Sequence, residues 1–320
     1  YQMGVAEFGE ELMTERFQTS AVRLLKNIFR VGLFENPYLE VADTEAIVGN
    51  AEFMQAGYEA QLKSVVLLKN KDALLPLDSS KSVYIPQRYF PSTRGYFGPP
   101  SKPEWKDAMN KELAATYYNL EDDPAKADVA IVVIHSPSHG RSSGYSQEDA
   151  ATGANGFVPI SLQYEDYTAT EGRDISLAGD ARETDVLNRS YKNKTVSVKN
   201  KKDLELIRST RKLMKGKPVI VILKLENPTV VNEFEADIDA LLVSFEVQDQ
   251  AMLDIISGKV EPSGLLPLQM PASMTAVEAQ LEDVPMDVEV HIDTQGNPYD
   301  FAFGLNWNGV IKDVRTEKYK

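Results

Sequence analysis

The chain has 320 residues, of which 42% are hydrophobic, a formal net charge of -14 and no cysteine. This length is enough for a large hydrophobic core and favours about two domains. The acidic balance argues against a nucleic-acid partner, which would be bound by clustered Lys and Arg. The lack of cysteine excludes a disulfide framework, a zinc-thiolate site and a cysteine nucleophile. We expect neither a membrane span nor a signal peptide in these residues.

The first part of the chain is predicted to be helical. Apolar residues recur at helical spacing within residues 8–30, and Gly32 can adopt the left-handed conformation that ends such a helix. A polar connector is expected at residues 39–49. A second helix is predicted over residues 51–69, because its apolar residues again share one face.

From Lys81 onward, strand and helix patterns alternate. Strands are predicted at residues 82–86, 129–134, 218–225 and 240–245, and helices at 105–115, 203–214, 229–236 and 248–257. Strands that are separated by helices form βαβ crossovers and a parallel sheet with helices on both faces. We therefore predict an α/β fold with a mostly parallel sheet sandwiched by helices.

The polar segment at residues 135–202 is the predicted site loop, because ligands of open α/β sheets bind outside the carboxyl ends of strands. Long loops without secondary structure are also usually functional or disordered. Each acidic residue of this loop is by default a solvated side chain, so the pattern alone does not select among them. They are Glu148, Asp149, Glu165, Asp166, Glu171, Asp174 and Glu183.

Other catalytic and cofactor motifs receive no support. Ser142 lies in a Gly-x-Ser-x-Gly pattern, but no helix pattern follows it, so a flexible turn is favoured over a nucleophile elbow. No glycine-rich phosphate loop follows a predicted strand. His135 and His139 have no carboxylate partner at metal-ligand spacing in the sequence. We therefore expect neither a metal nor a cofactor.

Four segments resemble, in order, parts of a known family. They are residues 21–38 (AVRLLKNIFRVGLFENPY), 64–77 (with SVVLLKN and LLPL), 261–267 (EPSGLLP) and 299–305 (YDFAFGL). They are similar to the end of the catalytic barrel, the start of the second domain and two later signatures of glycoside hydrolase family 3, the β-glucosidase family. The segments span nearly the whole chain.

This resemblance implies three parts in the chain. Residues 1–38 resemble the last helical part of a (β/α)8-type barrel domain, residues 39–80 a linker and the helix that leads onward, and residues 81–320 the α/β sandwich. The nucleophile of the family is an aspartate in an SDW-like barrel segment, and no such segment occurs here. The resemblance thus predicts the C-terminal part of a retaining β-glycosidase, inactive without the missing N-terminal barrel domain as its partner.

The resemblance also implies site residues. The sequence TEGRD at residues 170–174 is similar to the SGEGxDR segment of the family, which gives Glu171 the role of general acid/base. Glu148 and Glu183 remain alternatives for this role. Substrate contacts are predicted for Arg173, Asp174 and Tyr145. Residues 246–250 (EVQDQ) depart from the usual Gly-Gln-x-Gly of the family.

A second interpretation stays open: a non-catalytic carbohydrate-binding or structural lobe, in which Glu171 is only a surface residue. Both interpretations predict the same fold. The expected partner is an oligosaccharide or β-glycoside, with no nucleic acid and no membrane span, and a homodimer is possible. The resemblance favours a periplasmic or extracellular location.

Overall fold

The structure, a computed structural model, describes residues 1–92, 99–139, 160–170, 192–281 and 284–318. The chain divides into two compact units, Tyr1–Gly57 and Tyr58–Lys320. Within the described ranges, none of the helices combines the length and the apolar character needed to cross a membrane.

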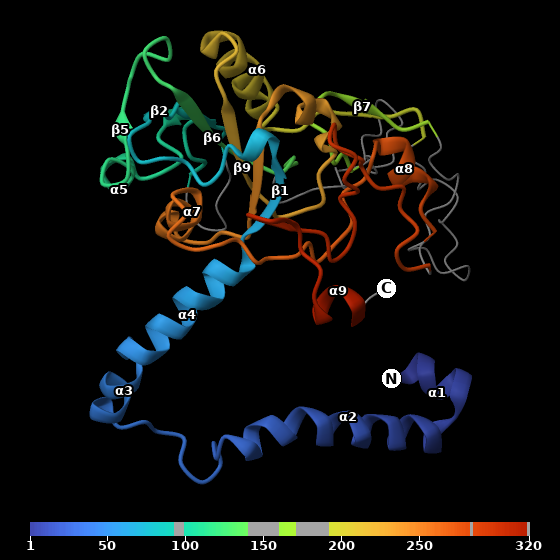
Figure 1. The fold of residues 1–320 in the computed structure, drawn as a ribbon. Helices are drawn as coiled ribbons and strands as arrows, with labels where there is room; N and C mark the ends of the chain where they lie inside the picture. Colours follow the sequence, from blue (N-terminus) through green and yellow to red (C-terminus); the bar gives the residue numbers. More distant parts are fainter. Residues whose placement is uncertain (93–98, 140–159, 171–191, 282–283, 319–320) are drawn as a thin grey trace. The chain divides into compact units, whose positions relative to one another are not determined.

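The N-terminal unit is helical. It contains α1 (Gln2–Phe8), α2 (Glu10–Arg30), α3 (Val41–Ile47) and the beginning of α4 (Ala51–Ser64) (Figure 1). The predicted helix over residues 8–30 is confirmed as α2, and Gly32 has the expected left-handed φ of +70°. The predicted connector at residues 39–49 instead contains α3. No side chain of residues 1–57 is buried; Leu24 and Phe29 on α2 are 74% and 58% exposed.

The C-terminal unit is built on an eight-stranded sheet with the order β12-β11-β1-β10-β9-β6-β2-β5. The five strands from β10 to β5 are parallel, whereas β1, β11 and β12 are antiparallel to their neighbours. The predicted mostly parallel sheet is therefore confirmed. The strands are β1 (Val66–Asn70), β2 (Ser82–Tyr84), β5 (Asn119–Leu120), β6 (Val129–His135), β9 (Val219–Lys224), β10 (Ala240–Ser244), β11 (Leu305–Asn306) and β12 (Gly309–Val310).

Helices cover both faces of this sheet. Helix α6 (Lys202–Met214) packs on β6 and β9, whereas α5 (Lys111–Ala114) and α7 (Asp249–Ile256) pack together on the other side (Figure 1). The central strands β6, β9 and β10 are buried almost throughout. Their continuous apolar runs follow from this cover, since both faces of a central parallel strand contact helices.

A buried ionic group joins β1 to the C-terminal part of the sheet domain. Lys69 Nζ lies 2.5 Å from Glu235 Oε1, and both side chains are at most 3% exposed. Thr294 Oγ1 also donates to Glu235 Oε1 at 2.9 Å, and His291 Nε2 lies 3.6 Å from Glu235 Oε2. Glu235 lies in the short 3-10 helix η4 (Glu235–Asp237), so three segments that are distant in sequence meet at this carboxylate.

The predicted helix over residues 51–69 is wrong in its second half. Helix α4 ends at Ser64, and residues 66–70 form β1 between β10 and β11. Val65, Val66, Leu67 and Leu68 are all 0% exposed. A short apolar run fits a buried helix and a buried strand equally well. Residues 66–70 form a strand because they pair with β10.

Two further helix predictions are too long. Of the predicted helix at residues 105–115 only α5 is helical, capped by Asn110, which accepts from Leu113 N at 3.0 Å. The preceding strand β4 (Glu104–Lys106) pairs instead with β3 (Arg88–Phe90). The predicted helix at residues 229–236 consists of two 3-10 turns, η3 (Val231–Glu233) and η4.

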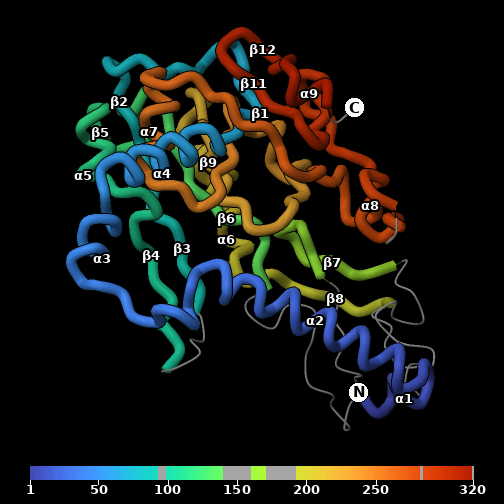
Figure 2. The backbone as a smooth tube through the Cα atoms, turned by 90° about the horizontal axis from the view of Figure 1, so that it is seen from below, coloured from blue at the N-terminus to red at the C-terminus, as the bar shows by residue number. Residues whose placement is uncertain are grey.

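The predicted loop at residues 135–202 contains a ribbon. Strands β7 (Tyr167–Thr168) and β8 (Thr195–Val196) pair antiparallel and run side by side in Figure 2. The hydroxyl groups of Thr168 and Thr195 are 2.7 Å apart and link the two strands. The remaining described helices are η1 (Lys71–Ala73), α8 (Met274–Ala279) and α9 (Val314–Lys318).

Candidate functional site at the carboxyl edge of the sheet

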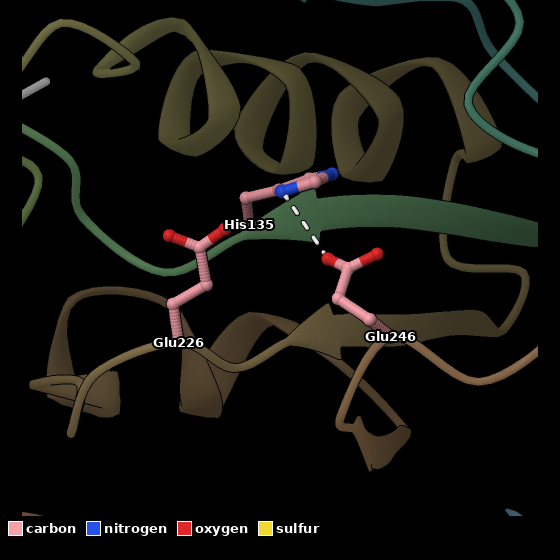
Figure 3. Close-up of side chains that lie close together, drawn as sticks. All are labelled: His135, Glu226 and Glu246. Carbon is pink, nitrogen blue, oxygen red and sulfur yellow. Dashed lines mark ion pairs between the residues drawn. The ribbon is translucent and has the colours of Figure 1, made fainter. Parts of the chain in front are cut away.

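Parallel strands β6, β9 and β10 end together and bring polar side chains to one edge. His135, the last residue of β6, lies in register with Lys224 of β9, and Lys224 lies in register with Ser244 of β10. Glu226 and Glu246 follow two residues beyond Lys224 and Ser244. Figure 3 shows both carboxylates near the imidazole of His135. We call His135, Glu226 and Glu246 the carboxyl-edge cluster.

The cluster combines one half-buried imidazole with two exposed carboxylates. His135 Nδ1 lies 3.8 Å from Glu246 Oε1, and Lys224 Nζ lies 3.8 Å from Glu246 Oε2. Burial and the charges of Arg88 and Lys224 lower the pKa of His135 to about 3. The imidazole is therefore neutral at pH 7, and Lys224 is the cation that pairs with Glu246.

The backbone of His135 is held from several sides. Its amide donates to Asp203 Oδ2 at 3.2 Å, and its carbonyl accepts from Tyr164 Oη at 2.6 Å and from Asn200 Nδ2 at 3.1 Å. Tyr164 is 0% exposed, and Asn200 and Asp203 are at most 2% exposed. These buried partners fix the end of β6, from which the imidazole projects.

Asp203 also forms a buried ion pair with Arg88 from β3. Both nitrogen-oxygen contacts, from Nε to Oδ1 and from Nη2 to Oδ2, are 2.8 Å long, which is the bidentate geometry of strong arginine-carboxylate pairs. The two side chains are 4% and 1% exposed. Burial raises the pKa of Asp203, whereas the hydrogen bonds and charge of Arg88 lower it. The guanidinium also lies 4.7 Å from the centre of the Phe90 ring.

The segment that leaves β6 is anchored at the same edge. Ser138 N donates to Asn200 Oδ1 at 2.8 Å, and its carbonyl accepts from Lys199 N at 2.8 Å. On the far side of residues 140–159, Ser161 N donates to His139 Nε2 at 3.1 Å. The described residues on either side of 140–159 therefore meet at His139 and Ser161.

The described residues before 171 and after 191 pair in the ribbon β7–β8. Ala169 N donates to Lys194 O at 3.1 Å, and Asn193 N donates to Ala169 O at 2.8 Å. Glu233 accepts from Tyr164 N and Glu165 N, at 2.5 and 2.8 Å, and so fixes the chain that leads into β7. The same Tyr164 contacts His135. The ribbon is thus connected to the carboxyl edge by hydrogen bonds.

The predicted catalytic and substrate-binding residues lie outside the described part of the chain. These are Tyr145, Glu171, Arg173 and Asp174, together with Ser142, Glu148 and Glu183. Their assigned roles stay predictions.

Sequence reasoning missed the members of the carboxyl-edge cluster as a group. His135 had no carboxylate partner at metal-ligand spacing, but Glu226 and Glu246 come from the two neighbouring strands. A signal was present, because each of the three residues follows or ends a predicted strand. Carboxyl ends of parallel strands meet at one edge of a sheet.

Comparison with known proteins identifies the family of this fold. Residues 65–307 match the glycosyl hydrolase family 3 C-terminal domain, and this range is well over half of the chain. The chain belongs to glycoside hydrolase family 3. The match begins at the start of β1 and ends after β11, so it includes the whole parallel part of the sheet.

Several proteins with similar sequences are named β-glucosidases. Beta-glucosidase C of Emericella nidulans is 30% identical over 275 residues, which cover 86% of this chain and 34% of that protein. A relative from Dickeya chrysanthemi, named periplasmic beta-glucosidase/beta-xylosidase, is 24% identical over 278 residues, or 87% of this chain and 33% of that protein. The chain thus spans about a third of the length of these relatives.

A solved β-glucosidase structure shares the fold. A β-glucosidase from Erythrobacter marinus superposes with a TM-score of 0.53 at 17% identity, over 96% of this chain and 42% of that protein. At this identity the similarity shows a shared fold only.

Proposed function

We propose that this chain is the C-terminal part of a retaining β-glycosidase, with Glu171 as general acid/base. The observation that carries the proposal is the family 3 match over residues 65–307, which includes the TEGRD segment at residues 170–174. The anchoring of Ala169 to Lys194 supports it, because the segment with Glu171 then starts from a ribbon that is tied to the carboxyl edge. Ligands of α/β sheets bind at that edge.

The proposed reaction needs a second carboxylate. A retaining glycosidase holds two carboxyl groups about 5–5.5 Å apart, one as nucleophile and one as acid and then base. In this proposal the nucleophile is an aspartate of a barrel domain. Its charge and the exclusion of water by a bound sugar would raise the pKa of Glu171, as an acid near neutral pH requires. Arg173, Asp174 and Tyr145 are proposed to contact the sugar.

The apolar surface of the N-terminal unit supports a barrel partner. Large side chains of α2 are exposed, among them Phe17 at 51%, Leu24 at 74% and Phe29 at 58%. Contiguous exposed apolar surface usually marks an interaction site. We propose that a (β/α)8-type barrel domain covers this helix. Light scattering of residues 1–320 with and without the barrel tests this assignment against a homodimer.

We also propose a periplasmic or extracellular location, in line with the periplasmic name of the Dickeya chrysanthemi relative. The substrate class in this proposal is a β-glycoside or a short oligosaccharide. Fractionation of cells that produce the protein, followed by detection in the periplasm and the medium, tests the location.

The variant Glu171→Gln, assayed together with the barrel domain, tests whether Glu171 is the general acid/base. Loss of the acid/base should slow turnover of an unactivated disaccharide by about 100-fold to 10,000-fold. Substrates with very good leaving groups need no proton, so the glycosyl-enzyme should form and accumulate. Added azide should then restore turnover, because it replaces water without needing a base. Residues 1–320 alone should hydrolyse no aryl β-glucoside.

Glu148→Gln and Glu183→Gln are the matched controls, because each removes one carboxylate of the same loop. Wild-type turnover of a disaccharide by Glu171→Gln would reject the assignment and move the role to one of these residues. A change in binding alone, with turnover intact for every leaving group, would favour the carbohydrate-binding or structural interpretation.

A further inference from the structure

The carboxyl-edge cluster has the composition of a metal site. One imidazole nitrogen and two carboxylate oxygens, from His135, Glu226 and Glu246, lie within 4.8 Å of one another. They come from three adjacent parallel strands, so the sheet itself brings them together (Figure 3). We propose that these three side chains bind a divalent zinc ion.

The distances fit zinc with small side-chain rotations. Tetrahedral zinc with bonds of about 2.0–2.2 Å separates two ligand atoms by about 3.4 Å. His135 Nδ1 and Glu246 Oε1 are already 3.8 Å apart. Glu226 is exposed, and Glu246 is 52% exposed, so both carboxylates can turn toward the ion without displacing packed residues.

The surroundings orient two of the ligands. Lys224 Nζ contacts Glu246 Oε2, which leaves Oε1 as the oxygen that faces the imidazole. The hydroxyl of Ser136, which is 2% exposed, accepts from Glu226 N at 3.0 Å and ties the chain after β9 to the residue that follows His135. The backbone positions of His135 and Glu226 are thus fixed relative to each other.

The types of ligand atom in the cluster favour zinc over calcium and magnesium. Calcium prefers six to eight oxygen ligands, and magnesium keeps most of its water shell. An imidazole nitrogen with two carboxylates instead suits zinc, and three protein ligands leave the fourth position for water or another oxygen ligand. The chain has no cysteine and only two other histidines, His139 and His291, so few residues compete for the ion.

Zinc alone is the probe, titrated into residues 1–320 by calorimetry and in competition with a chromophoric chelator. The wild-type chain should bind one zinc ion. His135→Ala and Glu246→Gln should each weaken binding by at least about 10-fold to 100-fold, which is the loss that follows removal of an outer-shell partner alone. His139→Ala, which removes a different imidazole, and Glu205→Gln, which removes an exposed carboxylate of α6, should leave the affinity unchanged. Thermal unfolding confirms that each variant is folded.

Three results would overturn the proposal. One is equal zinc affinity in the wild type and in Glu246→Gln, a surface change that leaves the core intact. Another is tighter binding of calcium or magnesium than of zinc when each is titrated in the same way, since those ions prefer oxygen ligands to the imidazole of His135. Loss of zinc binding in His139→Ala, with His135→Ala unaffected, would likewise assign the ion elsewhere. The assay does not depend on glycosidase activity.

Discussion

The ion pair between Arg88 and Asp203 should be the most sensitive point of the carboxyl edge. In Asp203→Asn, one oxygen that accepts from the guanidinium is replaced by an amide that donates. The side chain at this position accepts four hydrogen bonds, two from Arg88, one from Asn200 Nδ2 at 2.9 Å and one from His135 N at 3.2 Å. The variant also leaves a guanidinium that is 4% exposed without its counter-charge.

Removing one partner of a buried pair costs about 3–5 kcal/mol, because the remaining charge stays out of water. We therefore expect Asp203→Asn to lower the free energy of unfolding by about 3–5 kcal/mol. The double variant Arg88→Met with Asp203→Leu removes both charges and should lose much less than the sum of the two single variants.

Urea unfolding of the wild type and the variants measures these differences, provided that the unfolding free energy falls with urea concentration at the same slope in each. Glu165→Gln is the matched control. Glu165 pairs with Arg208 at 2.6 Å, but the two side chains are 58% and 48% exposed. An exposed pair contributes about 0–1 kcal/mol. If Asp203→Asn costs no more than Glu165→Gln, the reasoning about burial is wrong.

Two further predictions concern the sheet domain. Burial opposes the charge of Glu235, but the nearby imidazole of His291, the hydrogen bond from Lys69 and the charge of Lys69 lower its pKa from 4.5 to about 2. A lowered pKa adds stability above pH 4.5 that is lost as pH falls toward 2, here about 3 kcal/mol. Urea unfolding between pH 5 and 2.5 should therefore show a steeper loss in the wild type than in Glu235→Gln; parallel curves would contradict this. Gly264→Ala should destabilise by about 1–3 kcal/mol or more, because its Cβ would lie 2.3 Å from Val65 O. A Cβ added at Gly57 meets nothing within 4 Å, so Gly57→Ala should leave the thermal stability unchanged or raise it. Equal losses of stability in the two variants would refute the steric argument.

The sequence by itself determined the central elements of the fold. The apolar runs at residues 129–134, 218–225 and 240–245 are confirmed as β6, β9 and β10, and residues 203–214 as the greater part of α6. These predictions succeeded because a strand that is covered on both faces must be apolar along its whole length. The family signatures likewise depend on short local strings of residues, which can be recognised without a structure.

Tertiary structure alone decided which distant residues meet. Residues 66–70 are a strand because they pair with β10, and Arg88 meets Asp203 across 115 positions of sequence. His135 approaches Glu246 because β6 and β10 are both neighbours of β9. Local patterns specify which residues are buried in an element, whereas contacts across a sheet depend on strand order. Strand order is set by the burial of the whole sheet between its helices.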